Sequence, residues 1–222
     1  PALRPGGRSG AGAWLRLRRW ITVTTEPTPN PKSMKFIPHG KDILGSGTKT
    51  KLFRNVYEAG DSPLARALFE LEGVREVMLA SHHVTITKTT LADWDDLQGS
   101  IEAAIGNFLE TGVEPVSRDA VESADATIEA EPGSIEHRII ELLENRVKPF
   151  VQQDGGDVQF DRFDHADGTL YLQMQGSCSG CSQSHATLQV GVKNLMEHYI
   201  PEVKEIVGLS EEEEEDIPRP GR

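Results

Sequence analysis

The sequence of 222 residues contains few cysteines and no long apolar run. Its two cysteines, Cys178 and Cys181, are too few for the disulfide framework of a small secreted domain. No apolar run approaches the roughly 18 residues that a membrane-spanning helix needs, so no such helix is expected. In the glycine-rich stretch from Gly40 to Gly47, Ser46 stands after the second glycine where a phosphate-binding loop has lysine, which argues against nucleotide binding.

Acidic residues are absent from the first 25 positions, although the whole chain carries a net charge of −12. The remainder is therefore strongly acidic and should repel nucleic acid and anionic lipid surfaces. The first positions instead combine arginines with tryptophan and leucine, a composition typical of a mitochondrial import presequence. We therefore predict that residues 1–22 are a presequence remnant and that the protein resides in the mitochondrial matrix.

The spacing of apolar residues over positions 23–112 predicts a small α+β domain with the order β-α-β-β-α. One helix should begin at Ser62-Pro63, because proline suits the first helical position. Asp93 should cap a second helix that runs to about Glu110. His82 and His83 fall in a predicted turn and are interpreted as solvent-exposed. The predicted strands are Met34–Ile37, Val74–Ala80 and His83–Lys88.

Residues 113–133 are rich in acids and small residues, so we expect an extended, mobile linker between two domains. The second domain is predicted over residues 134–209, where a first helix should end or kink at Pro149. Residues 210–222 are expected to form an acidic tail. The remaining predicted elements are a glycine turn at Gln153–Asp157, a hairpin turn at Asp167-Gly168, strands at Val158–Phe163, Leu170–Met174 and Val203–Val207, and a helix at Ser182–Tyr199. The predicted fold class is thus α+β, with two small domains joined by an acidic flexible linker.

The loop Gly176–Cys181 holds both cysteines, between a predicted strand and a predicted helix. The start of a helix leaves backbone N–H groups unpaired and carries a partial positive charge, so it favours thiolate over thiol. Two thiolates at C-x-x-C spacing can occupy adjacent positions of one metal ion or cluster. A tetrahedral site formed by sulfur needs four thiolates, so two chains would have to share it.

Spacing alone leaves three interpretations of Cys178 and Cys181 open. The pair could be half of a four-cysteine site, shared in a dimer and holding an iron–sulfur cluster or zinc. It could be a thiol–disulfide couple, because thioredoxins also place C-x-x-C between a strand and a helix. It could be purely structural. The thioredoxin interpretation is weakened by topology, since only one helix and one short strand are predicted after the loop.

Longer runs around this loop resemble a known family. Val151–Val158 together with Leu172–Cys181 is similar to the NifU-like C-terminal domain, and Ile200–Val203 fits the same domain. The earlier part of the chain resembles the N-terminal domain of mitochondrial Nfu-type iron–sulfur scaffolds, through Thr28–Pro38, Ser62–Ala65 and Val84–Lys88.

This resemblance implies a scaffold or carrier without catalytic turnover, which assembles or delivers [4Fe–4S] clusters to mitochondrial recipient apoproteins. Lipoyl synthase and respiratory-complex subunits are the implied recipients, and upstream assembly proteins are implied partners. Cys178 and Cys181 are the implied ligands of a cluster shared between two subunits, so the cluster-loaded form should be a homodimer or larger. The family also implies helices packed on a three-stranded sheet in the cysteine-containing domain.

Overall fold

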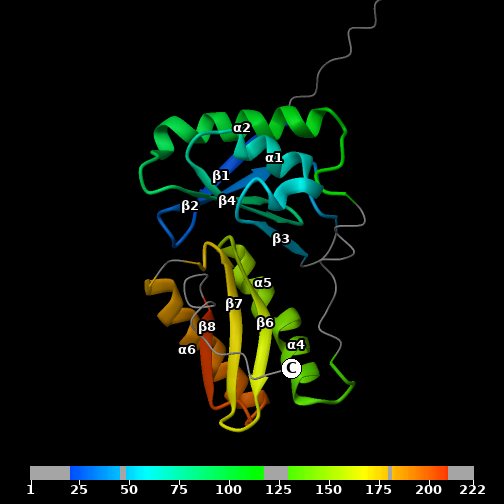
Figure 1. The fold of residues 1–222 in the computed structure, drawn as a ribbon, viewed down its shortest axis with the longest axis vertical. Coiled ribbons are helices and arrows are strands. Elements are labelled where there is room, and N and C mark those ends of the chain that lie inside the picture. The colour runs from blue at the N-terminus through cyan, green and yellow to red at the C-terminus, as the bar shows by residue number, and fades with distance from the viewer. Residues whose placement is uncertain (1–20, 46–48, 118–129, 180–181, 210–222) are drawn as a thin grey trace, which may run out of the picture.

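The computed structural model describes residues 21–45, 49–117, 130–179 and 182–209, with only the backbone described for residues 182–189. Figure 1 shows two units, one at each end of this part of the chain, and each unit combines helices with its own sheet. The predicted α+β fold class is confirmed. No helix among the described residues is long and apolar enough to cross a membrane.

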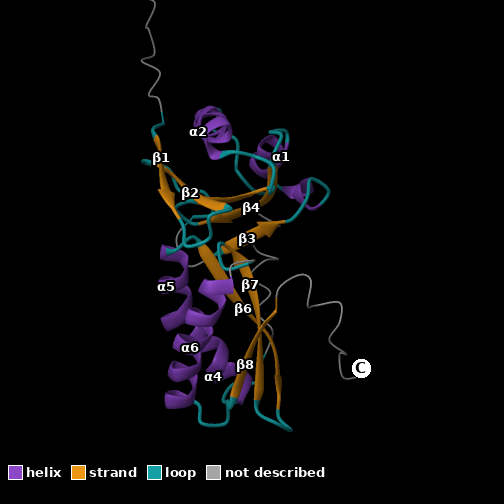
Figure 2. Ribbon diagram, turned by 90° about the vertical axis from the view of Figure 1, so that its left-hand side faces the viewer, coloured by secondary structure: helices purple, strands orange, loops and turns teal. Residues whose placement is uncertain are grey.

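The N-terminal unit is a five-stranded antiparallel sheet in the order β1-β2-β5-β4-β3. Helices α1 and α2 lie on one face of this sheet, as Figure 2 shows, and the apolar core fills the space between them. Strand alternation places Val84 and Ile86 in that core and Thr85 and Thr87 on the opposite face. The elements are β1 (Val23–Pro27), β2 (Ser33–Pro38), β3 (Thr50–Phe53), the 3₁₀ helix η1 (Glu58–Asp61), α1 (Pro63–Phe69), β4 (Val74–Ala80), β5 (Val84–Lys88) and α2 (Trp94–Glu110).

The predicted β-α-β-β-α order is present, but the sheet has two further strands. β1 and β3 went unpredicted because they are short and partly exposed, so neither shows a clear apolar alternation. The predicted helix starts are confirmed, since Ser62 and Asp93 accept hydrogen bonds from Ala65 N and Asp95 N. The interpretation of His83 as solvent-exposed is wrong. It precedes β5 and is only 8% exposed, whereas His82 at the turn is exposed.

The first residues of the predicted linker pack against the N-terminal unit. Val116 is buried in its core, and Pro115 O accepts a hydrogen bond of 2.7 Å from Ser62 Oγ. Ser117 N donates to Asp61 O over 2.8 Å. An extended conformation was expected from residue 113 onward, and this part of the expectation is wrong. The acidic composition of the segment did not indicate that the core would bury one of its apolar side chains. Residues 118–129 lie outside the described part.

The C-terminal unit has a three-stranded sheet in the order β6-β7-β8 with helices packed on one face, as Figure 2 shows. β6 and β7 form an antiparallel hairpin, and β8 lies parallel to β7. The hairpin turns at Gly168, whose φ is +80°, as the Asp167-Gly168 signal predicted. The elements are α4 (Ile135–Leu142), the π-helical segment η2 (Leu143–Val147), α5 (Lys148–Gln153), β6 (Gly156–Asp164), β7 (Thr169–Gly176), α6 (Ser182–Tyr199) and β8 (Glu205–Leu209).

Pro149 does not end the first helix of this unit, contrary to one of the two outcomes expected for it. The helix passes through the π-helical segment η2, where Lys148 N donates to Leu143 O, and continues as α5 to Gln153. A proline lacks the N–H of an ordinary helical turn, and the wider π-turn places Pro149 in the first turn of α5, where that N–H is not needed.

The two units have separate apolar cores and meet through a polar junction. Every residue of one core cluster precedes residue 117, and every residue of the other follows residue 138. At the junction, the end of β7 lies against β4 and β5, on the sheet face that α1 and α2 leave uncovered. Figure 1 shows the same arrangement, with β7 reaching up to the N-terminal sheet.

Candidate functional site

The first half of the cysteine loop is a hydrogen-bonded turn at the end of β7. Cys178 N donates to Gln175 O over 3.3 Å, and Ser179 N donates to Gly176 O over 3.2 Å. The side chain of Ser179 strengthens this turn, because its Oγ donates to the same Gly176 carbonyl over 2.8 Å. The loop therefore positions Cys178 through its own backbone, directly before the region where α6 begins at Ser182.

The glycine turn after α5 and the cysteine loop are parts of one structure. Gly155 takes a φ of +76°, which is the glycine conformation that the sequence predicted for this turn. Ser177 N donates to Gly155 O over 3.2 Å, and Ser177 Oγ donates to Asp154 O over 2.7 Å. These bonds explain why the two motifs occur together in the chain: each completes the hydrogen bonding of the other.

Gly156 leaves the space that the Cys178 side chain occupies. A Cβ atom on Gly156 would lie 2.2 Å from Cys178 Sγ, a distance that no side chain can tolerate. Gly156 also pairs with Gly176 across the hairpin, so two residues without side chains face each other beside the thiol. The glycines are thus required by close approach as well as by backbone freedom.

Cys178 is only 5% exposed and packs in the apolar core of the C-terminal unit. Cys181, the second predicted site residue, lies outside the described residues, so the structure brings only one of the pair into view. Within the described residues, no three His, Cys, Asp or Glu side chains gather where they could hold a metal ion. A metal or cluster at Cys178 would need further ligands from elsewhere.

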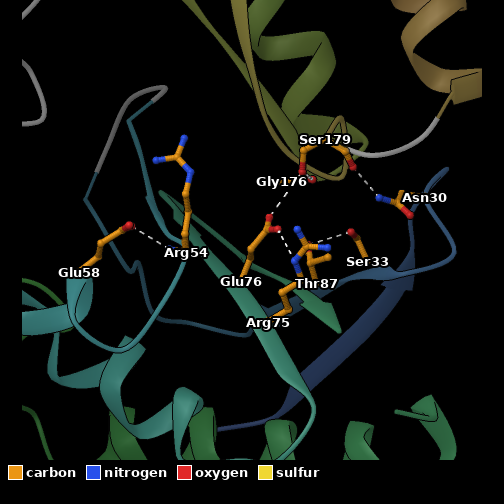
Figure 3. Close-up of polar contacts among 9 residues, drawn as sticks. All are labelled: Asn30, Ser33, Arg54, Glu58, Arg75, Glu76, Thr87, Gly176 and Ser179. Atoms are coloured by element: carbon orange, nitrogen blue, oxygen red, sulfur yellow. Dashed lines mark hydrogen bonds and ion pairs between the residues drawn. The ribbon is translucent and has the colours of Figure 1, made fainter. Parts of the chain in front are cut away.

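The uncovered face of the N-terminal sheet packs directly on the cysteine loop. Asn30 Nδ2 donates to Ser179 O over 2.9 Å, and Ser179 Oγ lies 3.5 Å from Glu76 Oε2. Figure 3 shows Asn30 and Glu76 reaching the loop from two different parts of the N-terminal unit, with Gly176 beside Ser179. A Cβ atom on Gly176 would lie 2.8 Å from Met78 Sδ, so β4 also contacts the loop through an apolar side chain.

Lys35 of β2 reaches the glycine turn from the same face. Its Nζ donates to Gln153 O over 2.8 Å and forms an ion pair of 2.7 Å with Glu26 Oε2. The hydrogen bond and charge of Lys35 hold the pKa of the Glu26 carboxyl below its usual range. Lys35 is largely buried, whereas the Glu26 carboxylate that it pairs with is exposed to water.

Asp157 closes the junction on the β3 side. Its carboxylate accepts a short hydrogen bond from Thr50 Oγ1 and a longer one of 3.4 Å from Gln152 Nε2. Burial raises the pKa of the Asp157 carboxyl, and the nearby Lys148 ammonium and the Thr50 hydrogen bond oppose this rise. A buried carboxyl is costly unless its hydrogen bonds are satisfied, and here Thr50 of one unit and Gln152 of the other supply them.

The residues that surround the loop were not predicted as site residues from the sequence. Asn30 lies in the run Thr28–Pro38, which carried the family resemblance, but nothing in that run indicated a contact 149 positions away. Asp157 was placed only in a turn, although it forms part of β6 and bonds to Thr50. Contacts between distant strands leave no periodic signal in a sequence, so these residues became visible only through the fold.

Two family models match the chain. The N-terminal domain of scaffold protein Nfu/NifU matches residues 23–112, and the NifU-like domain matches residues 139–207. A solved structure of a NifU-like protein from Saccharomyces cerevisiae is 24% identical, with a TM-score of 0.42, and the match covers 53% of this chain and 96% of that one.

Curated relatives match most of the chain. The protein named NFU1 iron-sulfur cluster scaffold homolog, mitochondrial, of Drosophila willistoni is 40% identical over 88% of this chain and 66% of its own length. The mitochondrial NifU-like protein 5 of Arabidopsis thaliana is 39% identical over 91% of this chain and 73% of its own length. The chain thus spans about two thirds to three quarters of the length of these relatives. Their names support the predicted mitochondrial location. The order of the two matched domains and the identity to these relatives show that the chain belongs to the family of NFU1 and NifU-like scaffold proteins.

Proposed function

We propose that this protein is an iron–sulfur cluster scaffold or carrier that assembles or delivers [4Fe–4S] clusters to mitochondrial apoproteins. The observation that carries the proposal is the loop geometry: the glycine turn and the cysteine loop form one hydrogen-bonded unit that presents Cys178 just before a helix. The name of the Drosophila willistoni relative, an iron-sulfur cluster scaffold homolog, supports the same role. No step of this role requires catalytic turnover by the protein.

Cys178 and Cys181 are the proposed ligands, and each of two chains would contribute its pair. A [4Fe–4S] cluster takes four thiolates, so a cluster bridged in this way has its full set of sulfur ligands only in the dimer. Separating the two chains removes half of the ligands, which suits transfer to a recipient better than permanent storage. The helix start beside the loop favours the thiolate form that the cluster requires.

We also propose a division of the chain into five segments. Residues 1–22 are a presequence remnant, residues 23–112 an Nfu N-terminal domain, residues 113–133 a linker, residues 134–209 the cluster-binding domain and residues 210–222 an acidic tail. Recipients such as lipoyl synthase and respiratory-complex subunits, and upstream assembly proteins, are the proposed partners in the mitochondrial matrix.

Anaerobic reconstitution with iron and sulfide tests this proposal. The full-length protein should gain a broad brown absorbance with about four irons per dimer, and its mass in solution should double when the cluster forms. Cys178→Ser should abolish both changes, while a serine substitution elsewhere, such as Ala92→Ser at a turn of the N-terminal unit, should leave them intact.

Two results would contradict the proposal. If the reconstituted protein stays colourless and monomeric, it does not bind a cluster. If a Cys178→Ser variant shows full absorbance, Cys178 is not a ligand. Rapid reduction of insulin disulfides by protein that holds no cluster would instead favour a thiol–disulfide couple. Metal analysis of protein purified without oxygen would identify zinc if zinc is the bound metal.

A further inference from the structure

The N-terminal sheet has one face that is buried without contributing to the core of its own unit. The residues on this face, and on the loop before β2, are Asn30, Lys35, Thr50, Glu76, Met78 and Thr85, and we call them the docking face. Five of the six carry polar side chains, and all contact or lie beside the turn and loop that hold Cys178. An antiparallel sheet with helices on one face commonly exposes the other face to water, and a polar face of this kind is stable there.

We propose that the docking face binds the cysteine loop of its own chain reversibly, and that a second copy of the C-terminal domain competes with it for that loop. This inference rests on the proposed function, since the competing copy is the partner in the bridged dimer. It assigns the N-terminal domain the role of an internal partner that covers the loop when no second chain does.

The chemistry of the contacts supports reversible docking. The junction is joined by side-chain hydrogen bonds, from Asn30 to Ser179 O, from Lys35 to Gln153 O and from Thr50 to Asp157, and water can replace each of them when the domains part. The two apolar cores share no residue, so the units can part without dividing either core. Interfaces between domains of one chain that are polar in this way resemble transient interfaces.

Geometry supports the competition. Met78 lies against Gly176, and Asn30 and Glu76 lie against Ser179. The docking face therefore contacts loop residues before and after Cys178. Figure 3 shows the loop resting on the strands of the N-terminal sheet. A cluster that joins Cys178 to a second chain needs that second chain to approach the same loop. Two partners cannot occupy one short loop, so docking and bridging exclude each other.

Thr85 offers a way to break the docking without breaking a bond. It is 1% exposed, and its hydroxyl has no hydrogen-bond partner among the described residues. A Cβ atom on Gly155 would lie 3.1 Å from Thr85 Oγ1, so the side chain points at the glycine turn. Thr85→Arg would place a long charged side chain against that turn, whereas on an undocked sheet the arginine would reach water.

The experiment measures how fast a maleimide modifies Cys178 in the full chain, in a Cys181→Ser background that leaves one thiol. Thr85→Arg should raise the rate about tenfold or more, because each tenfold change in a docking equilibrium needs only a modest loss of binding free energy. Thr24→Arg is the matched control, since Thr24 is an exposed threonine on β1 of the same sheet, and its rate should equal that of the parent. Equal rates in Thr85→Arg and Thr24→Arg would overturn the inference, because burial of Cys178 would then come from the C-terminal domain alone.

A second pair of variants decides the question if circular dichroism shows that Thr85→Arg does not fold. Asn30→Ala removes one junction hydrogen bond and should raise the rate about fivefold. Asn55→Ala removes an exposed asparagine of the same unit whose side chain bonds to its neighbours Tyr57 and Glu58, and it should leave the rate unchanged. If Asn30→Ala matches Asn55→Ala, docking does not control access to Cys178.

Anaerobic reconstitution of chains with both cysteines separates this inference from the proposed function. Thr85→Arg should form the brown dimer at a lower protein concentration than Thr24→Arg, since it lacks the internal competitor. If both variants require the same concentration, the competition is wrong although cluster binding stands. If neither gains a chromophore, the proposed function fails, and the alkylation rates still decide whether the docking face covers the loop.

Discussion

The two units of this protein are both sheets with helices on one face, but different parts of the two sheets meet at the junction between the units. In the C-terminal unit this part is the narrow end of the sheet, where Gly156 and Gly176 let the backbone and Cys178 Sγ approach closely. In the N-terminal unit it is a broad, mostly polar face, which contacts the loop and the glycine turn largely through side-chain hydrogen bonds. Close packing against backbone tolerates no added atom, whereas hydrogen bonds can be exchanged for water. The comparison therefore predicts large effects at the loop and smaller effects on the face.

Gly156→Ala should produce the largest effect. Its methyl group would lie 2.2 Å from Cys178 Sγ, so either the loop moves or the C-terminal unit is destabilised by about 3 kcal/mol or more. Gly191→Ala is the control, because a Cβ atom there meets nothing within 4 Å and alanine favours a helix. Urea unfolding followed by far-ultraviolet circular dichroism measures both. A Gly156→Ala variant as stable as Gly191→Ala, with a normal cluster spectrum, would show that the loop is not closely packed.

His83 should make the N-terminal unit sensitive to acid. Burial, with smaller contributions from the charges of Lys35 and His82, lowers the pKa of His83 to about 4. The unfolded chain binds a proton near pH 6.5, before the folded chain does, so stability is lost as the pH falls from 6.5 toward 4. The loss from this residue amounts to about 3 kcal/mol at the lower end.

His83→Gln should remove this part of the pH dependence, and the exposed neighbour variant His82→Gln should keep it. All three tryptophans lie in the first 94 residues, so tryptophan fluorescence during urea unfolding reports on the N-terminal unit. The free energy of unfolding is compared at pH 7 and at pH 4.5. If the free energy of unfolding falls by the same amount between pH 7 and pH 4.5 in both variants, His83 is not held neutral in the folded protein.

The serine caps of the two helical layers should differ in effect because their surroundings differ. Ser62 is fully buried, caps α1 by accepting from Ala65 N and also donates to Pro115 O over 2.7 Å. Ser134 caps α4 by accepting from His137 N over 3.1 Å, at a more exposed position. Ser62→Ala should therefore cost about 2 kcal/mol of stability and Ser134→Ala about 1 kcal/mol. Differential scanning calorimetry of both variants would refute the comparison if the order were reversed.

Lys35→Met should have the smallest effect on stability, although it lies on the docking face. It replaces a charged stem by an apolar one of similar length and loses bonds to Gln153 O and Glu26 that water can replace. We expect a change of less than about 1 kcal/mol in the free energy of unfolding, close to that of Lys32→Met at an exposed position. A loss several times larger would mean that the face is a rigid interface, whose hydrogen bonds water cannot replace.

Much of the local structure could be predicted from the sequence, because its signals lie within a few residues. The helix Ser182–Tyr199 and the hairpin turn at Gly168 match the prediction, since an apolar stripe and an Asp-Gly pair act over one element. β3 and the continuation of the helix past Pro149 were missed or left open. The first has only four residues, and the second depends on a π-turn that no composition indicates.

The sequence by itself determined the family, the two-part organisation and the two candidate thiols, because each depends on residue types in order along the chain. The tertiary structure alone decided what lies around Cys178. Gly156 lies so close to its sulfur that no Cβ atom would fit between them, and this approach exists only once β6 and β7 pair; Asn30 reaches Ser179 only after two separate units pack together. Such contacts arise from long-range packing, in which residues far apart in the chain become neighbours without any local pattern to announce it.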